Sequence, residues 1–294
     1  EERKNKPVVE KASTTNINWY PGHMAKTKRQ IIENINLIDV VYEVIDARLP
    51  FSSKIKDIDN IIKNKPRILI MTKKDLCDME VTSKWIKYYE EKNIPVLCMD
   101  LTNNLDFKKL VKKTEEVTFL LQERRKERGL KTKEIKAVVL GIPNVGKSTL
   151  INKMAGKKVA MVGNKPGVTK QINWLKTTSN ILILDTPGIL WPKLDDNEVA
   201  LNLASTAAIK TDVLDICDIG GYLISFFKNY YPKILTDKYK VDIQDDIIDI
   251  MAFIALNMGA VKGDEFDAEK VSRRIYTDVV NGNIKGVTFD QWKK

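Results

Sequence analysis

The chain has 294 residues, with 49 Lys and Arg against 39 Asp and Glu, so its formal net charge is +10. An apolar content of 43% suffices for one large or two medium domains, and three cysteines without a C-x-x-C pair argue against a disulfide framework or a zinc ribbon. The single histidine excludes a His-rich metal site, and the absence of an 18-residue apolar run or a secretory h-region favours a cytoplasmic protein with no membrane partner.

Helical and strand patterns alternate along the first two thirds of the chain. Residues 1–16 are polar and aperiodic, which is typical of a mobile tail. Helices are expected over 21–36, 54–64, 80–92 and 105–130, and strands over 38–46, 66–72, 94–100, 135–141, 171–177 and 180–186. This alternation predicts an α/β fold with a doubly wound, mostly parallel sheet over residues 17–194. Beyond Trp191-Pro192 the pattern is almost entirely helical, so we expect a smaller all-helical domain over 195–294.

The segment GIPNVGKST (141–149) lies between a predicted strand and a predicted helix and matches the phosphate-binding loop G-x-x-x-x-G-K-[ST]. This context disfavours a chance match. Lys147 would reach the β- and γ-phosphates, and the Ser148 hydroxyl would bind Mg²⁺. An anion site at a helix N-terminus would be formed by successive backbone N–H groups, those of Asn144, Val145, Gly146, Lys147, Ser148 and Thr149.

A later strand end adds contacts to the metal and the γ-phosphate. In NILILDTPG (180–188), Asp185 would hold Mg²⁺ through a water, and the Gly188 N–H would face the γ-phosphate. Between the two motifs, KPGVTK (165–170) offers Thr169 as a residue that closes over Mg²⁺ and the γ-phosphate. An ordinary turn threonine is the alternative interpretation of Thr169.

The strand over 66–72 ends in Thr72, Lys73, Lys74 and Asp75. Guanine presents two donors on one edge, and a single carboxylate such as Asp75 can accept both, whereas adenine lacks that pair. The Lys73 stem would lie on the base plane. The segment resembles the guanine-specificity motif N/T-K-x-D of GTPases, with Thr72 where Asn is commoner. After the next strand, Asp100 and Leu101 in MDLTNN (99–104) are the positional candidates for the base-supporting loop.

The order of these motifs is unusual. In most GTPases the guanine motif follows the phosphate-binding loop, but here it precedes that loop by about 70 residues. The sequence therefore predicts a circularly permuted GTPase, in which the switch segment runs directly into the C-terminal domain at residues 189–195. Nucleotide state could reach that domain through this short linker.

Three further segments narrow the resemblance: INWYPGHMAKTKRQI (17–31), IDARLPFSS (45–53) and PGILWPKLDDNEVALNLASTAAIK (187–210). With GIPNVGKST and TKKD they resemble the ribosome biogenesis GTPase A family, also called YlqF-type GTPases. The resemblance implies a bacterial or organellar factor that hydrolyses GTP while bound to the maturing large ribosomal subunit and its rRNA. It implies GTP or GDP and Mg²⁺ as ligands, no DNA partner, and a monomer away from the ribosome.

The water-positioning group is not supplied at its usual place. In Ras-like enzymes a Gln after D-x-x-G orients the attacking water, but this position is Ile189, so we expect slow intrinsic hydrolysis and stimulation by the ribosomal subunit. A neutral imidazole can accept a hydrogen bond from water near pH 7, which makes His23 the internal candidate. The resemblance also assigns this histidine a catalytic part; the alternative is a structural histidine that caps the following helix.

A second cation and an RNA contact are also expected. Asn144 holds the position that, in related K⁺-dependent GTPases, helps to bind potassium; alternatively it only stabilises the loop. The candidate rRNA contacts in the N-terminal motifs are Lys26, Lys28, Arg29 and Arg48. The 105–130 helix adds Lys108, Lys109, Lys112, Lys113, Arg124, Arg125, Lys126 and Arg128, which fit phosphate contacts and a solvated face with Glu–Lys pairs equally well.

Rival functions stay open on the sequence alone. One is an rRNA-binding scaffold or sensor in which GTP is mainly a structural or regulatory ligand. Another is a permuted GTPase of the small subunit, although such relatives carry an OB-fold or a zinc site that is not seen here. The formal net charge is +15 over residues 1–194 and −5 over residues 195–294. We therefore expect the RNA contact first in residues 1–194.

Overall fold

The computed structural model describes residues 22–129, 134–160, 173–189, 196–209, 214–242, 246–262 and 265–292, and side chains from residue 27 onward within them. Several predictions fall outside this part: the tail over 1–16, Thr169, the domain boundary near 192–195, and the side chains of His23 and Lys26. Elsewhere the predicted elements are present with ends that shift by a few residues.

The first two thirds of the chain form one six-stranded sheet with its helices. The strands are β1 (Val40–Asp46), β2 (Arg67–Thr72), β3 (Val96–Cys98), β4 (Ile135–Leu140), β5 (Asn173–Lys176) and β6 (Ile181–Asp185). The helices are α1 (Gly22–Asn34) with its extension η1 (Ile35–Leu37), α2 (Ile58–Ile62), α3 (Met79–Glu91), α4 (Asn104–Glu127) and α5 (Lys147–Ala155). The sheet order is β3-β2-β1-β4-β6-β5, parallel except for the edge strand β5. This confirms the doubly wound, mostly parallel architecture.

The order of the strands indicates which edge of the sheet would bind a ligand. Successive strands run outward from β1 to β2 and β3, and outward from β4 to β6 in the other direction, so β1 and β4 are neighbours at the switch point. In open α/β sheets, ligands bind beyond the carboxyl ends of the strands at such a point. The phosphate-binding motif follows β4 there, and Asp46 ends β1 beside it.

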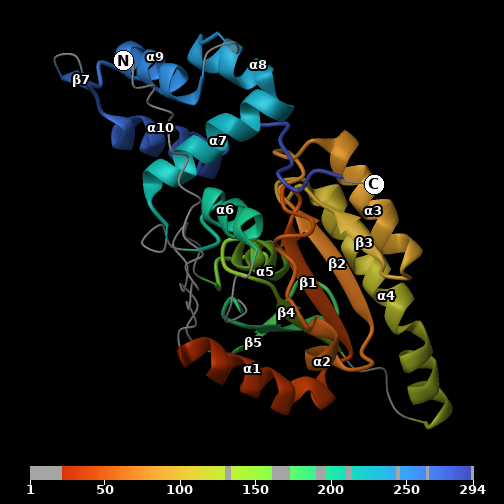
Figure 1. Cartoon of the computed structure of the whole chain (residues 1–294). Coiled ribbons are helices and arrows are strands. Elements are labelled where there is room, and N and C mark those ends of the chain that lie inside the picture. The colour runs from red at the N-terminus through yellow and green to blue at the C-terminus, as the bar shows by residue number, and fades with distance from the viewer. Residues whose placement is uncertain are drawn as a thin grey trace, which may run out of the picture.

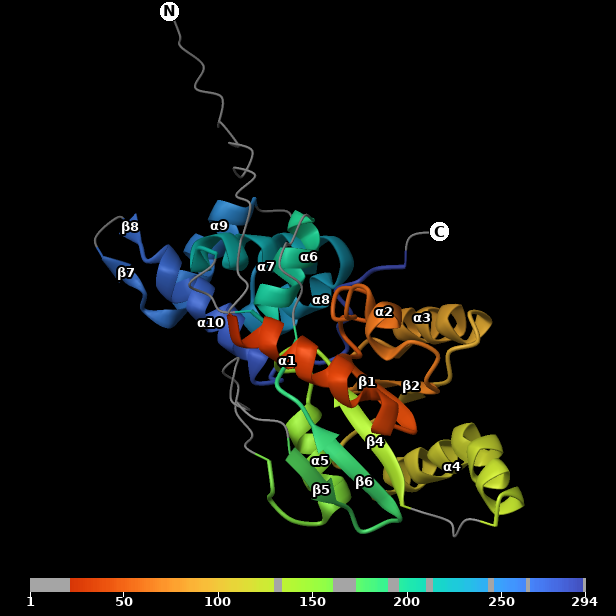
Figure 2. The ribbon, with the colours of Figure 1, turned by 90° about the horizontal axis from the view of Figure 1, so that it is seen from below.

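Helices cover both faces of the sheet, which explains the near-continuous apolar strands. All seven residues of β1 are buried. Ile45, Leu69 and Met71 pack in one cluster with Tyr89 of α3, whereas Tyr42 shares a 2.8 Å hydrogen bond between its hydroxyl and that of Thr114 on α4. Helix α1 leads through η1 into the start of β1, so it lies at the end of the sheet opposite the phosphate-binding motif (Figures 1 and 2).

The rest of the chain is mostly helical and gathers beyond the carboxyl edge of the strands (Figure 1). Its elements are α6 (Asn197–Ser205), α7 (Ile216–Tyr230), α8 (Pro232–Ile234), the π-helical turn η3 (Leu235–Tyr239), α9 (Ile247–Met258) and α10 (Ala268–Val280). A short antiparallel hairpin of β7 (Val261–Lys262) and β8 (Glu265–Phe266) interrupts them, which helical periodicity did not indicate. Within the described residues, no helix is long and apolar enough to span a bilayer.

The chain end does not stay with the helices, contrary to the expected domain over 195–294. Residues 281–292, here called the C-terminal strap, leave α10 and pack against the GTPase sheet near α3 (Figure 1). The Asp290 carboxylate accepts 2.7 Å hydrogen bonds from the backbone N–H groups of Phe51 and Ser52. The Trp85 indole donates to the Asp290 carbonyl at 2.8 Å, and its ring packs edge-on against Trp292. The strap therefore ties the helical part to the loop that follows β1.

Candidate guanine nucleotide site

The loop over 141–146 connects β4 to α5 by a turn that requires glycine at both ends. A Cβ on Gly141 would lie 2.4 Å from the Val44 carbonyl oxygen, and Gly146 has a left-handed φ of +94°. Ser148 and Thr149 lie half-buried in the first turn of α5, where backbone N–H groups have no intrahelical acceptor. The turn thus presents a row of donors suited to phosphate oxygens.

Lys147 is a buried cation beside this turn. Its ammonium donates to the Ile142 carbonyl oxygen at 2.7 Å, and the side chain is only 7% exposed. Burial lowers the pKa of Lys147 to about 8, although the nearby Asp185 opposes the shift. A buried ammonium held by one neutral carbonyl can exchange that contact for phosphate oxygens at a net gain.

Asp185 ends β6 on the other side of β4 and carries an unsatisfied oxygen. Its Oδ1 is buried without a hydrogen-bond partner in the structure, and burial raises the pKa of this carboxyl to about 6, against the opposing effect of Lys147. An orphaned buried carboxylate oxygen fits a magnesium site, because it can accept from a metal-bound water. Ser148 offers a hydroxyl from α5, so the residues present fit Mg²⁺, which would neutralise phosphate charge when bound.

The turn after β6 packs directly on the phosphate loop. The Ile189 N–H donates to the Gly141 carbonyl at 3.0 Å, and the Thr186 hydroxyl donates to the Val139 carbonyl at 2.6 Å. The Ile189 side chain is buried in the core. It therefore cannot orient a water, as its apolar character already indicated.

The predicted guanine motif lies next to the phosphate loop across the switch point. The Thr72 hydroxyl hydrogen-bonds the Ile45 and Val145 carbonyls, so it joins β1 to the loop. The Lys73 ammonium lies 2.8 Å from both the Asn144 carbonyl oxygen and the Asp46 carboxylate. Asp75 is exposed at the end of the motif, where its carboxylate is accessible to a base. The predicted phosphate-binding loop and the carboxylate predicted to bind the base therefore share one edge of the sheet.

Comparison with known proteins identifies the family. Residues 136–254 match the family profile described as 50S ribosome-binding GTPase. The ribosome biogenesis GTPase A of Priestia megaterium is 41% identical over 277 residues, which cover 93% of this chain and 96% of that protein. This chain belongs to the ribosome biogenesis GTPase A family. The Thermotoga maritima member is 28% identical over 276 residues, covering 94% of each chain.

Solved structures of the ribosome biogenesis GTPase A family have the same fold. A GDP-bound structure of Thermotoga maritima YlqF covers 90% of this chain and 99% of its own, with a TM-score of 0.66 at 23% identity. A second YlqF structure, bound to GNP, gives a TM-score of 0.63. The permuted order of motifs is consistent with this fold, and family membership makes the protein a GTP hydrolase that takes guanine nucleotides and participates in ribosome biogenesis.

The base loop of this family member differs in part from the expectation. Leu101 is buried, and its Cδ1 would lie 3.3 Å from a Cβ on Gly146, so it supports the phosphate loop. The Asp100 carboxylate instead accepts hydrogen bonds from the backbone N–H and the hydroxyl of Thr102, at 2.8 and 2.7 Å. Asp100 therefore shapes its own turn through one carboxylate oxygen, and its part in binding the base stays a prediction.

The expected rRNA contact of Arg48 is wrong for this conformation of the ribosome biogenesis GTPase. Arg48 is 2% exposed and forms a two-pronged ion pair with Asp46, with nitrogen–oxygen distances of 2.9 and 3.1 Å. A buried guanidinium has no access to RNA phosphates. Lys28 is half-buried and Arg29 exposed on α1, so these two remain accessible.

Gly188 provides a test of the contact between the turn and the phosphate loop. A Cβ at this position would lie 2.8 Å from the Pro143 nitrogen and 3.0 Å from its Cα, and neither backbone atom can move without shifting the loop. We expect Gly188→Ala to lower the free energy of unfolding by about 1–3 kcal/mol and GTP-analogue affinity at least about tenfold, a cost of roughly 1.4 kcal/mol. Denaturant unfolding and calorimetric binding would measure both, and wild-type values would contradict the contact.

The matched control is Gly221→Ala in α7, where a Cβ would meet nothing within 4 Å. This substitution should raise the free energy of unfolding by about 0.5–1 kcal/mol, because alanine is the better helix former. Nucleotide affinity should not change.

Proton uptake on nucleotide binding follows from Lys147. Between its pKa of about 8 and the ordinary value near 10.5, the folded protein holds fewer protons than the unfolded chain, so stability without nucleotide rises with pH there. Phosphate binding favours the ammonium form, and we expect GDP to take up about half a proton at pH 8 and almost none at pH 6.5. Titration calorimetry in buffers of different ionisation enthalpy measures this uptake. Equal heats in all buffers at pH 8 would contradict it.

Proposed function

We propose that this GTPase binds the maturing large ribosomal subunit and couples GTP hydrolysis to a late assembly step. The family assignment supports a role in ribosome biogenesis, and the bacterial relatives favour the bacterial cytoplasm as its place of action. The observation that carries the proposal is the distribution of charge, with a balance of +15 over residues 1–194 against −5 over the remainder. Such an excess over the part of the chain that carries the nucleotide motifs favours a phosphate-rich partner such as rRNA.

Helix α4 carries free positive charge that suits such a partner. Of the eight basic side chains of α4 and its C-cap Arg128, four form ion pairs: Lys109 with Asp106, Lys113 with Glu116, Arg125 with Asp39 and Lys126 with Glu123. The other four, Lys108, Lys112, Arg124 and Arg128, are exposed and form no ion pair with any described residue. Ion pairing thus accounts for only half of these basic side chains, and the other four are available to contact phosphates.

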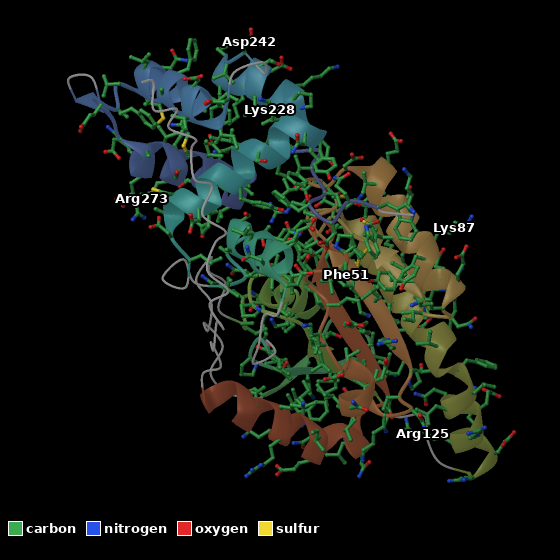
Figure 3. The ribbon with its side chains drawn as sticks, in the orientation of Figure 1. Phe51, Lys87, Arg125, Lys228, Asp242 and Arg273 are labelled. Carbon is green, nitrogen blue, oxygen red and sulfur yellow. The ribbon has the colours of Figure 1, made fainter. Side chains whose placement is uncertain are left out.

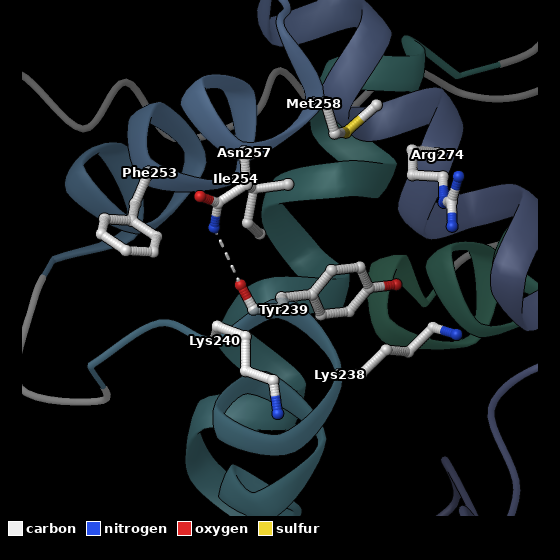
Figure 4. A pocket seen from close by; sticks show the side chains of 8 residues that line it. All are labelled: Lys238, Tyr239, Lys240, Phe253, Ile254, Asn257, Met258 and Arg274. Atoms are coloured by element: carbon white, nitrogen blue, oxygen red, sulfur yellow. Dashed lines mark hydrogen bonds between the residues drawn. The ribbon is translucent and has the colours of Figure 1, made fainter.

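The acidic helical part also has a local basic face. Lys238, Lys240 and Arg274 line a cavity of about 500 Å³ together with Phe253 and Met258 (Figure 4). Lys238 and Arg274 share the Asp278 carboxylate, at 3.6 and 3.2 Å, while Lys240 is exposed. A second rRNA contact at this face would explain how a region of negative net charge can take part in the same complex.

We propose that each motif contacts the part of the nucleotide that it contacts in other GTPases. Asn144, Val145, Gly146, Lys147, Ser148 and Thr149 hold the phosphates, with Gly188 at the γ-phosphate. Thr72, Lys73, Lys74 and Asp75 form the guanine side, with Leu101 behind the base. Ser148, Asp185 and Thr169 hold Mg²⁺. The support is the adjacency of these motifs at one sheet edge and the unsatisfied Asp185 oxygen.

Two further roles complete this proposal. We propose that His23 orients the attacking water, because Ile189 is buried and apolar. Since α1 lies at the end of the sheet opposite the phosphate-binding motif, this role requires the start of α1 to move to the nucleotide site. Unchanged single-turnover hydrolysis by His23→Ala, with GTP binding intact, would exclude His23 from the mechanism. K⁺ binds near Asn144, whose side-chain amide donates to the Ala207 carbonyl at 2.8 Å and whose φ is +61°. Equal turnover in KCl and NaCl at one ionic strength would exclude potassium.

Co-sedimentation with separated ribosomal subunits tests the proposal. We expect the protein to pellet with the large subunit in a GTP analogue and to be released in GDP, with affinity that falls steeply with salt. Lys108→Glu with Lys112→Glu should weaken pelleting at least about tenfold, a loss of roughly 1.4 kcal/mol. The matched control is Lys87→Glu, which changes an exposed lysine on α3 and not on α4 (Figure 3), and this variant should pellet normally.

Subunit-stimulated hydrolysis separates the GTPase from the scaffold alternative. Strong stimulation of turnover by the large subunit supports the coupled enzyme. Normal pelleting without stimulation would favour a scaffold whose GTP is a structural or regulatory ligand. Pelleting only with the small subunit would overturn the proposal.

A further inference from the structure

A buried charge cluster lies beneath the guanine motif. The Asp46 carboxylate, at the end of β1, contacts the Lys73 ammonium at 2.8 Å and the Arg48 guanidinium at 2.9 and 3.1 Å. Asp46 and Arg48 are each 2% exposed. Paired burial of this kind fixes side chains closely, because either partner left alone would be a buried, unpaired charge.

Arg48 continues this cluster into the helical part. Its Nη1 donates to the Val279 carbonyl at the end of α10, at 3.1 Å, and its backbone carbonyl accepts the Phe289 N–H of the C-terminal strap at 2.8 Å. A continuous path therefore runs from the phosphate loop at Asn144 through Lys73, Asp46 and Arg48 to the strap. This path lies on the side of the site where the guanine motif is found.

The strap also grips the other end of the guanine motif. The Val287 N–H donates to the carbonyl of Leu76, the residue after Asp75, at 3.1 Å. The Thr288 hydroxyl accepts from the Asp78 N–H at 3.1 Å and lies 2.9 Å from the Thr82 hydroxyl. The strap thus contacts the two ends of the segment over residues 73–76. It reaches Lys73 indirectly, through Arg48 and Asp46, and it contacts Leu76 directly.

We infer that Asp46 and Arg48 are positioning residues for guanine recognition, and that the C-terminal strap sets nucleotide affinity by clamping the Lys73–Leu76 segment. Docking of the strap preorganises Lys73 against the phosphate loop and Asp75 toward the base. By linkage, nucleotide binding strengthens docking of the strap by the same factor. The inference requires only the GTPase activity and is independent of the proposed ribosomal partner.

Two variants loosen the strap from different sides. Arg48→Ala removes the contacts to Asp46 and Val279. Asp290→Asn weakens the anchor on the Phe51 and Ser52 N–H groups without touching the guanine motif. We expect at least a tenfold weaker Kd for GDP in Arg48→Ala and a several-fold weaker Kd in Asp290→Asn, with kcat at saturating GTP within threefold of wild type. Arg48→Lys, which keeps one ion pair to Asp46, should recover part of the affinity.

The matched control breaks a comparable ion pair at the other end of β1. Arg125 contacts Asp39 at 2.9 Å where β1 begins, and Figure 3 shows Arg125 at the opposite end of the sheet from Phe51. Arg125→Ala should lower the melting temperature yet leave the Kd for GDP unchanged. This separates loss of nucleotide affinity from a general loss of stability.

Hydrogen exchange supplies the reciprocal measurement in the full-length protein. GDP should slow exchange of the Val287 and Phe289 amides, which donate to Leu76 and Arg48, and this protection should shrink in Arg48→Ala. If Arg48→Ala does not fold, Asp290→Asn and the wild-type exchange data decide. Wild-type Kd values in Asp290→Asn and Arg48→Lys, or strap amides that do not respond to GDP, would overturn the inference and leave the strap a structural element.

Discussion

Replacing Lys147 by methionine should weaken GDP binding by about 100-fold or more without destabilising the nucleotide-free protein. The ammonium would make charge-assisted bonds to phosphates worth about 3 kcal/mol in total, or roughly 100-fold in Kd. In the free protein it is buried against one carbonyl, 2.7 Å away. Methionine fills the same volume without the desolvation cost, so the free energy of unfolding should stay level or rise.

Calorimetric GDP titration and denaturant unfolding of Lys147→Met would measure both effects. The control is Lys153→Met, the same change at an exposed position in the last turn of α5. It should keep wild-type affinity. A Lys147→Met protein that binds GDP within a few-fold of wild type would show that the phosphates lie elsewhere.

Asp75→Asn should change which base the protein accepts. The exposed carboxylate is proposed to accept both guanine donors, and its loss should then cost about 2–4 kcal/mol, or roughly 30- to 1,000-fold in Kd for GDP. Xanthine carries a carbonyl where guanine carries the amino group, and an asparagine amide can donate to it. Affinity for xanthosine diphosphate should therefore rise above that for GDP.

Competition between GDP and xanthosine diphosphate measures this preference directly. Asp78→Asn is the matched control, because Asp78 caps α3 by accepting the Glu80 and Val81 N–H groups and lies three residues from Asp75. Asparagine keeps a side-chain oxygen that can accept these N–H groups, so stability should change little and the base preference should stay intact. A variant of Asp75 that still prefers GDP would remove this carboxylate from base recognition.

The elements and motifs were predictable because their signals are local. Runs of β-branched residues marked the central strands, and glycines at fixed spacing marked the phosphate loop, where Gly141 has no room for a side chain. The guanine motif was visible for the same reason, since Thr72-Lys73-Lys74-Asp75 follows a strand directly. The doubly wound, mostly parallel sheet was predictable from the alternation of strands and helices, whereas the order of its strands is known only from the structure.

What could not be predicted depends on contacts between distant residues. In the sequence, Arg48 is not distinguished from other basic residues. Only the fold shows that its guanidinium pairs with Asp46 and donates to the Val279 carbonyl. Asp290 lies in a short stretch of mixed polar and aromatic residues with no pattern, yet it anchors the strap on Phe51 and Ser52. The strands β7 and β8 have two residues each, which is too short for an alternating pattern to be detected, and helical patterns precede and follow them in the sequence.

The placement of β1 beside β4 has a consequence for how this chain folds. The backbone of Lys136 reaches the Asp39 carboxylate across 97 positions, the strap reaches Asp78 across 210, and Arg48 reaches Val279 across 231. Non-local contacts of this range form late and slowly, because long loops must close before they contribute. During synthesis the Lys73–Leu76 segment emerges early, but the residues that contact it in the C-terminal strap are made almost last. The ability to bind nucleotide therefore arises as one of the final events of folding.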